Sequence, residues 1–208
     1  MQSFYNQSMK IGEIEIDENT FLEKVRDTQE QRLRYAGCWE GGKKPVKERA
    51  IVCDFLRSQE AQDGQERIFA VRANPSIDVA PDCFGITKTG IIGYEVTELV
   101  DEETIIRNLR RKDGGRVIYK LKEWQPDEVT RKVQAILRQK DSRDFKGADF
   151  EQIVLIIHTG ELGLRHGDFS NLLLSHKFSR CDKINEAYFM FPHFPGRRHY
   201  PYVRLCLG

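Results

Sequence analysis

Two carboxylates, Asp82 and Glu95, occur in apolar segments that have the pattern of neighbouring β-strands. If residues 88–89 form a two-residue turn, the register of the resulting hairpin sets Asp82 directly across from Glu95. Facing side chains on antiparallel strands have Cβ atoms roughly 5 Å apart, which lets two carboxylates bind one hard cation through oxygen. Two adjacent buried acids are costly unless a proton or a cation neutralises them. The pattern therefore predicts a divalent metal site on this hairpin.

The length of the turn decides whether the two acids meet. A three-residue loop over residues 88–90 would slip the register by one position and separate Asp82 from Glu95. Strand alternation places Thr97 on the same face as Glu95, whereas Val96 points to the other face. The prediction of a shared site therefore depends on the two-residue turn.

Two short motifs occur in this hairpin. Pro81-Asp82 lies before the turn, and Glu95-Val96-Thr97 lies after it. Together they resemble the PD-(D/E)XK nuclease superfamily, in which an aspartate, and an acid two positions before a lysine, bind magnesium. Thr97 stands where the superfamily usually has its catalytic lysine. The resemblance covers about residues 45 to 160 and implies the α/β, restriction-endonuclease-like fold. In that fold a helix, a three-strand meander, a helix and a strand form the core of a mixed sheet flanked by helices.

The resemblance implies that Mg²⁺ or Mn²⁺ is the cofactor and that Asp82 and Glu95 are its ligands. It also implies that Glu48, on the first core helix, joins the site, although a carboxylate near the start of a helix is ordinary. Because the motif lysine is replaced, a lysine would come from elsewhere, and some members supply it from the helix after the hairpin. Lys132 and Lys140 are the candidates on that helix. Either could instead extend to water along the edge of the apolar stripe.

The implied function is that of a Mg²⁺-dependent nuclease, a hydrolase that cleaves phosphodiester bonds of nucleic acid, with DNA favoured over RNA as the substrate. A homodimer is compatible with it. The alternative is a catalytically inactive domain of the same fold that binds nucleic acid or a protein partner, which the missing lysine favours. A third interpretation is that Asp82 and Glu95 pair with Arg67, Arg72 or a lysine in a structural ion network.

Nucleic-acid binding would need local basic patches, because the formal net charge of +1 provides no overall positive field. A basic insert follows the hairpin, and a second basic segment occurs later in the chain. The residues expected to contact phosphates are Arg110, Arg111, Lys112, Lys120, Arg197 and Arg198. Charged inserts are equally often solvated surface, and the aromatic neighbours of the second segment suit packing at a sheet edge as well.

Helical and strand periodicities surround the hairpin. One helix is predicted over residues 45–61, and a second starts at Pro126 and repeats apolar residues at helical spacing. Residues 152–158 are apolar on both faces, as expected of a central covered strand. Two later segments, residues 188–192 and 202–205, have the pattern of edge strands.

The beginning of the chain differs in composition from the rest. It is polar and charged, with one predicted helix over residues 20–35. We therefore expect an N-terminal helical extension over residues 1–44 and a nuclease-like α/β domain over residues 45–208.

The overall composition, 39% hydrophobic over 208 residues, suits a packed core. No run of eighteen apolar residues predicts a membrane span, and the first residues lack the pattern of a signal peptide. The expected location is therefore cytoplasmic, away from membranes. Five scattered cysteines without C-x-x-C spacing predict buried thiols rather than a zinc site or disulfides.

Overall fold

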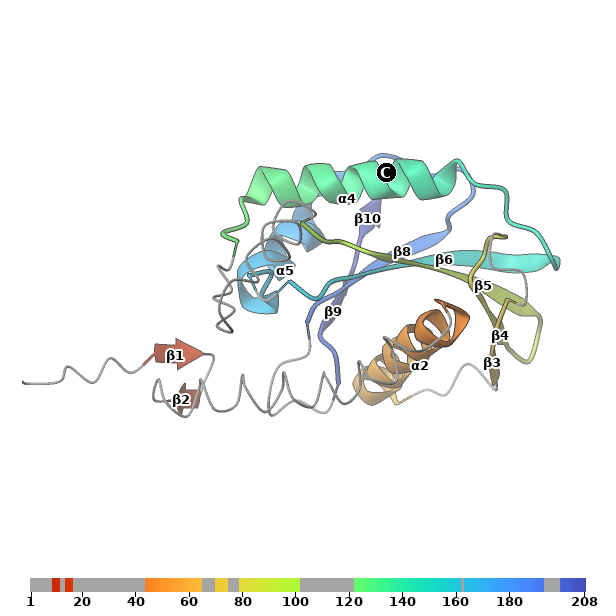
Figure 1. Cartoon of the computed structure of the whole chain (residues 1–208), viewed down its shortest axis with the longest axis horizontal. Helices are drawn as coiled ribbons and strands as arrows, with labels where there is room; N and C mark the ends of the chain where they lie inside the picture. Colours follow the sequence, from red (N-terminus) through yellow and green to blue (C-terminus); the bar gives the residue numbers. More distant parts are fainter. Residues whose placement is uncertain are drawn as a thin grey trace, which may run out of the picture.

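The computed structural model describes residues 9–11, 14–16, 44–64, 70–74, 79–101, 122–161, 163–192 and 199–208. Within them, helices cover both faces of a six-stranded sheet (Figure 1). The strands of this sheet are β3 (Ala70–Ala73), β4 (Cys83–Ile86), β5 (Ile91–Glu98), β6 (Phe150–His158), β8 (Glu186–Met190) and β9 (Tyr202–Arg204). The helices are α2 (Lys44–Asp63), α4 (Pro126–Asp141) and α5 (His166–Ser175). Two small ladders pair β1 (Met9–Ile11) with β2 (Ile14–Ile16), and β7 (Lys177–Phe178) with β10 (Cys206–Leu207).

The strand order across the main sheet is β3-β4-β5-β6-β8-β9. The first three strands form an antiparallel meander, β5, β6 and β8 run parallel, and β9 returns antiparallel to β8. A parallel step from β5 to β6 requires a crossover connection, and α4 lies between these strands in the chain. The predicted mixed α/β sheet flanked by helices is confirmed.

One prediction about the later strands is wrong. β8, which covers most of residues 188–192, is an interior strand between β6 and β9 and not an edge strand. The reason is its burial, because Ala187 and Phe189 pack on one face of the sheet while Tyr188 and Met190 pack on the other. A strand that is apolar on both faces suits the interior of a sheet whose two faces are covered. β9 is an edge strand, as predicted for residues 202–205.

The β4–β5 hairpin closes through the two-residue turn that the sequence predicts. The backbone N–H of Thr87 donates to Gly90 O at 3.0 Å, and Gly90 N donates to Thr87 Oγ1 at 2.9 Å. The register then pairs Ile86 with Ile91 and continues to the far end of β4. The alternative three-residue loop is excluded, and the register directs residue 82 across from residue 95.

The core is divided between the two faces of the sheet. On the α4 face, Val129, Val133 and Leu137 are completely buried at helical spacing, together with Leu155 of β6. On the α2 face, Phe55 packs within the second cluster, with Val154 and Ile156 of β6. Burying such a side chain contributes roughly 1.5 to 3 kcal/mol. The prediction that residues 152–158 form a central strand covered on both faces is confirmed.

Replacing Gly93 of β5 by alanine is expected to destabilise the fold by about 1 to 3 kcal/mol, because the added methyl overpacks the core. A Cβ at Gly93 would lie 2.6 Å from Ile153 Cδ1 and 2.9 Å from Pro81 Cγ, beside the segment that carries Asp82. Urea unfolding measures the change. The matched control is Gly167→Ala in the first turn of α5, where no heavy atom lies within 4 Å of the new methyl. Equal stability of the Gly93→Ala and Gly167→Ala chains would contradict the packing described here.

The N-terminal residues, the helices and the cysteines were also subjects of predictions. Within residues 1–44 the structure describes the paired strands β1 and β2, and the helix expected over residues 20–35 lies outside the described residues. No helix among the described ranges is long and apolar enough to cross a membrane. Cys83 is buried as predicted, whereas Cys53 and Cys181 are half-buried and Cys206, on the short β10, is exposed.

Candidate functional site

Glu95 lies in the middle of β5 with its side chain completely buried. Its neighbours Tyr94 and Val96 belong to the core against α2, so strand alternation directs Glu95 to the other face, toward α4. There Lys140, in the last turn of α4, donates a hydrogen bond to Glu95 Oε1 at 2.6 Å. Arg143, just beyond the helix, donates to the same oxygen at 2.5 Å. One carboxylate oxygen therefore accepts from two cationic side chains.

The second carboxylate oxygen of Glu95, Oε2, differs from Oε1 in its hydrogen bonding. Oε2 is buried and has no hydrogen-bond partner among the described residues. A buried polar atom that loses its hydration without gaining a partner costs about 1 to 3 kcal/mol, and more when it is charged. An ion or an ordered water is the usual way to satisfy such an atom. Glu95 therefore has one occupied and one available oxygen.

Asp82 comes immediately before β4 and is also buried. Its Oδ2 accepts a hydrogen bond at 2.8 Å from the backbone N–H of Val96, the residue after Glu95. The β4–β5 register, continued by one pair, sets Asp82 across from Glu95. The two acids that the sequence pairs are thus joined through one short piece of β5.

The segment that carries Asp82 is fixed by backbone contacts on two sides. Asn74, at the end of β3, donates its side-chain amide to Pro81 O at 2.9 Å and its backbone N–H to Asp82 O at 2.8 Å. The backbone N–H of Lys146 donates to Ala80 O at 2.8 Å. The loop after α4 is therefore attached directly to the segment that leads into β4.

Glu48 approaches the two acids from the first turns of α2. Its side chain is 12% exposed and lies 3.6 Å from Lys44 Nζ. Burial, followed by the negative charge of Asp82, raises the pKa of Glu48 to about 7, and Glu95 contributes in the same direction. Burial and the charges of both acids therefore favour the protonated form of Glu48.

The described residues include no group of three or more His, Cys, Asp or Glu side chains that together could hold an ion. Asp82 and Glu95, the two ligands expected from the resemblance, are thus a pair without a third such side chain beside them. Mg²⁺ is commonly held in proteins by one or two carboxylates and keeps several of its waters. A buried carboxylate pair with an available oxygen fits that requirement.

At pH 8 in EDTA, Glu48→Gln is expected to raise the midpoint of thermal unfolding by several degrees above that of the wild type. At pH 4 the midpoint of Glu48→Gln is expected to equal that of the wild type. The folded pKa of about 7 lies above the ordinary value of 4.5, so the folded state holds the proton more tightly. Glu48 therefore does not lower the free energy of unfolding below about pH 4.5, and it lowers this free energy increasingly as the pH rises toward 7. Thermal unfolding as a function of pH measures this slope. Glu60→Gln, at an exposed position of the same helix, is the control, and parallel curves for Glu48→Gln and wild type would contradict the burial of Glu48 among the acids.

The two lysines predicted to replace the motif lysine lie in different places. Lys140 reaches Glu95, whereas Lys132 lies 3.8 Å from Asp101 Oδ1 and 5.4 Å from the centre of the Trp124 ring. Lys122 belongs to the same separate network, at 2.9 Å from Asp101 and 2.5 Å from Glu128. The structure therefore brings Lys140, and not Lys132, to the acids, because the two lysines project from α4 at points two turns apart.

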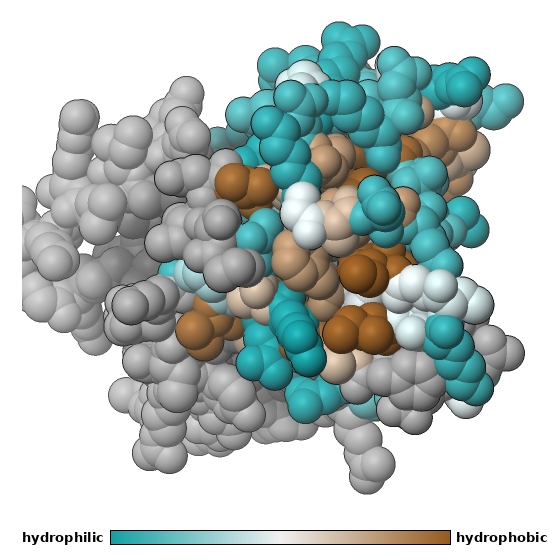
Figure 2. Space-filling model, turned by 90° about the vertical axis from the view of Figure 1, so that its right-hand side faces the viewer, coloured by the Kyte–Doolittle hydropathy of each residue, from teal (hydrophilic) through white to brown (hydrophobic). Residues whose placement is uncertain are grey.

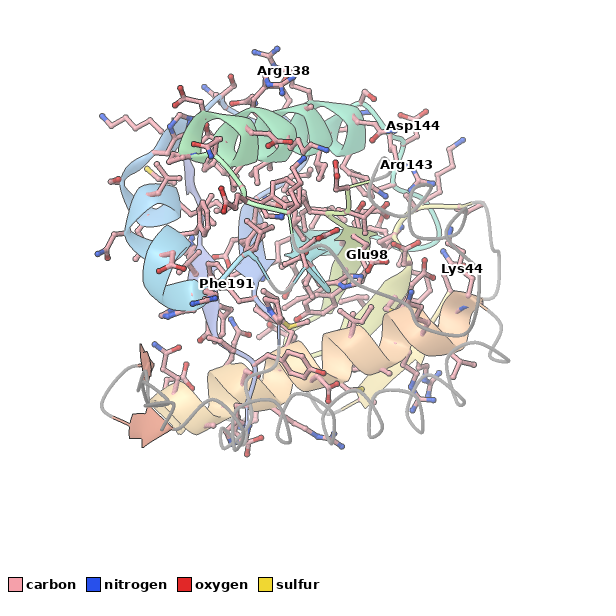
Figure 3. All side chains as sticks on the ribbon, turned by 60° about the vertical axis from the view of Figure 1, so that its left-hand side comes forward. Lys44, Glu98, Arg138, Arg143, Asp144 and Phe191 are labelled. Carbon is pink, nitrogen blue, oxygen red and sulfur yellow. The ribbon has the colours of Figure 1, made fainter. Side chains whose placement is uncertain are left out.

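Arg143 is the residue of this site that the sequence did not indicate. It lies after the last residue of α4, where helical periodicity no longer specifies a direction. Figure 3 shows Arg143 past the end of the helix and toward the sheet, whereas Arg138 projects from the outer side of α4. The Arg143 backbone is held at both ends, because its N–H donates to Lys140 O at 3.1 Å and its carbonyl accepts from Lys183 Nζ at 2.8 Å.

The end of the molecule that carries this site is mixed in polarity. Figure 2 shows hydrophilic side chains gathered over the end of α4 and apolar atoms exposed below it. The basic residues predicted to contact nucleic acid, Arg110, Arg111, Lys112, Lys120, Arg197 and Arg198, lie outside the described residues. Among the described cations, Lys140 and Arg143 contact Glu95 and Lys44 lies beside Glu48.

The fold and these contacts define a mixed α/β protein with two buried carboxylates, of which Glu95 contacts cations from a neighbouring helix and loop. No protein-family model matches the chain, and neither the curated proteins nor the solved structures give a significant match. The case for a function therefore depends on the geometry of Asp82, Glu95 and their neighbours.

Proposed function

We propose that this chain is a metal-dependent nuclease that hydrolyses phosphodiester bonds, with Asp82 and Glu95 as ligands of Mg²⁺ or Mn²⁺. The observation that carries the proposal is the buried Glu95 Oε2, which has no partner among the described residues and lies across the hairpin from Asp82. Such a cation, when bound, lowers the pKa of a water and offsets charge on the scissile phosphate. That combination is what hydrolysis of a phosphodiester requires.

The chain's own residues have distinct roles in this proposal. Asp82 is oriented by the Val96 N–H, which leaves its other oxygen for a ligand. Lys140 is held at Glu95 and supplies the positive charge that Thr97 cannot, so we assign it the role of the displaced lysine. Glu48 adds negative charge that favours a cation in this region.

The arrangement of elements supports a restriction-endonuclease-like core. α2 precedes the β3-β4-β5 meander, α4 follows it, and β6 then pairs in parallel with β5. We further propose DNA in preference to RNA as the substrate, contacts from the basic residues around 110–120 and 197–198, a cytoplasmic location and a possible homodimer. These proposals about substrate, contacts, location and oligomeric state depend on the resemblance to the nuclease superfamily and on the pairing of Asp82 with Glu95.

A second candidate is a catalytically inactive domain that binds nucleic acid or a protein partner. The observation that favours it is the ion pairing of Glu95 with both Lys140 and Arg143, which neutralises the carboxylate without a metal. Thr97 at the position of the motif lysine favours it as well. In this case the acids and cations form the structural ion network that the sequence also allowed, although with Lys140 and Arg143 as partners of Glu95.

Cleavage assays separate these candidates. The purified chain is incubated with single- and double-stranded DNA and RNA in Mg²⁺, Mn²⁺ or EDTA, and we expect cleavage only with the metal. Asp82→Asn is expected to lower the rate by about 100-fold or more, because asparagine keeps an acceptor for the Val96 N–H and loses the charge. Asp168→Asn, on the exposed first turn of α5, is the control. Absence of metal-dependent cleavage of every substrate, or full activity of Asp82→Asn, would favour the binding module.

A further inference from the structure

Glu95 carries one negative charge, yet two cationic side chains share one of its oxygens. The three side chains differ in exposure: Glu95 is 0% exposed, Lys140 15% and Arg143 32%. Lys140 belongs to the last turn of α4, whereas Arg143 belongs to the following loop. Arg143 is therefore the partner of Glu95 that can return to water at the lower cost.

A divalent cation between Asp82 and Glu95 would add positive charge next to both Lys140 and Arg143. Like charges at such separations repel strongly where the surroundings are partly buried. The repulsion is relieved if one of the two side chains leaves Glu95. Arg143 is more exposed than Lys140 and lies after the helix, so we take Arg143 as the side chain that leaves.

Only the side chain of Arg143 is free to move away. Its carbonyl is held by Lys183, and three residues later the Lys146 N–H is bonded to Ala80 O at 2.8 Å. The guanidinium therefore stays beside the acids after it releases Glu95. A guanidinium carries parallel N–H donors that match two oxygens of a phosphate.

We propose that Arg143 is an internal counter-ion that a divalent cation displaces from Glu95, and that the freed guanidinium then binds a phosphate of the substrate. This inference rests on the proposed nuclease function. It makes Arg143 a substrate-binding residue whose availability depends on the metal. Before the cation binds, the same residue neutralises the buried carboxylate.

The first test measures how tightly Mn²⁺ binds to the 208-residue chain, from the rise of its unfolding midpoint with Mn²⁺ concentration. Arg143→Gln is expected to bind Mn²⁺ about tenfold more tightly than the wild type, because the competing cation is gone. Arg143→Lys keeps the charge and is expected to stay near the wild type. Arg138→Gln removes the same charge from the outer side of α4 and is expected to leave the affinity unchanged.

The second readout is binding of a short DNA duplex in Ca²⁺, followed by fluorescence anisotropy. Arg143→Gln is expected to weaken this binding about tenfold, since a charged, two-donor phosphate contact is lost. Arg138→Gln is expected to change it much less. A structural role for Arg143 would lower the unfolding midpoint without changing the two affinities in opposite directions.

The outcomes separate the inference from the function on which it rests. If the wild type and Arg143→Gln bind Mn²⁺ equally, or if Arg138→Gln tightens binding as much, the inference is wrong and the proposed function stands. If no form of the chain binds Mn²⁺, the proposed function is wrong and the inference goes with it. If Arg143→Gln binds Mn²⁺ and the wild type does not, the cation fails to displace Arg143 and the inference is wrong.

Discussion

Glu95→Gln is expected to abolish metal-dependent cleavage, with a loss of about 1000-fold or more in rate. Glutamine has nearly the shape of glutamate but no charge, so it removes a metal ligand while filling the same space. It also leaves Lys140 and Arg143 without their shared counter-charge. The measurement is the initial rate of cleavage at saturating Mg²⁺.

The stability of the Glu95→Gln chain has to be measured alongside its rate. Removing one partner of a buried ion pair costs about 3 to 5 kcal/mol in general, although glutamine still offers an oxygen to the two cations. Glu151→Gln is the control, because Glu151 lies on the neighbouring β6 and is exposed. A folded Glu95→Gln chain that cleaves at the wild-type rate would remove Glu95 from the chemistry.

Lys140→Met is expected to lower the cleavage rate by about 10²- to 10⁴-fold, the range found for side chains that transfer or stabilise a proton in a reaction. Methionine keeps most of the unbranched side chain and loses the ammonium that lies 2.6 Å from Glu95 Oε1. Binding of Mn²⁺ is expected to persist or to tighten, because Glu95 loses one competing cation. Cleavage rates and the Mn²⁺-dependent unfolding midpoint together measure both effects.

Lys132→Met is the matched comparison for Lys140→Met. The ammonium of Lys132 lies near Asp101 and over Trp124, far from the acids along α4, so its loss is expected to leave the cleavage rate close to that of the wild type. The opposite result, with Lys132→Met inactive and Lys140→Met active, would show that the lysine of the reaction is not the one that contacts Glu95.

The parts of the site that could be predicted from the sequence are those fixed by short-range geometry. The turn at residues 88–89 determines the register of β4 against β5, and alternation then determines the face on which Glu95 lies. Lys140 was predictable as one of two candidates, because helical spacing places it on the apolar side of α4. These inferences need only the neighbouring residues of one hairpin or one helix.

The remaining features depend on tertiary packing. Arg143 follows the last turn of α4, and its direction is determined by contacts of its loop with residues far away in sequence, such as Lys183 and Ala80. The interior position of β8 likewise depends on pairing with β6 and β9. Helical spacing alone does not show which of Lys140 and Lys132 contacts Glu95, since that depends on the strand residue that lies beneath each lysine.

Asp82 and Glu95 are proposed to share one divalent cation, and a crystal grown with Mn²⁺ tests this sharing most directly. Anomalous difference density would locate the ion independently of any activity. We expect one peak within bonding distance of Glu95 Oε2 and of the Asp82 carboxylate, with the Arg143 guanidinium withdrawn from Glu95. A chain that shows no peak between residues 82 and 95, with Glu95 still held by Lys140 and Arg143 at high Mn²⁺, would contradict the metal site and the nuclease function built on it.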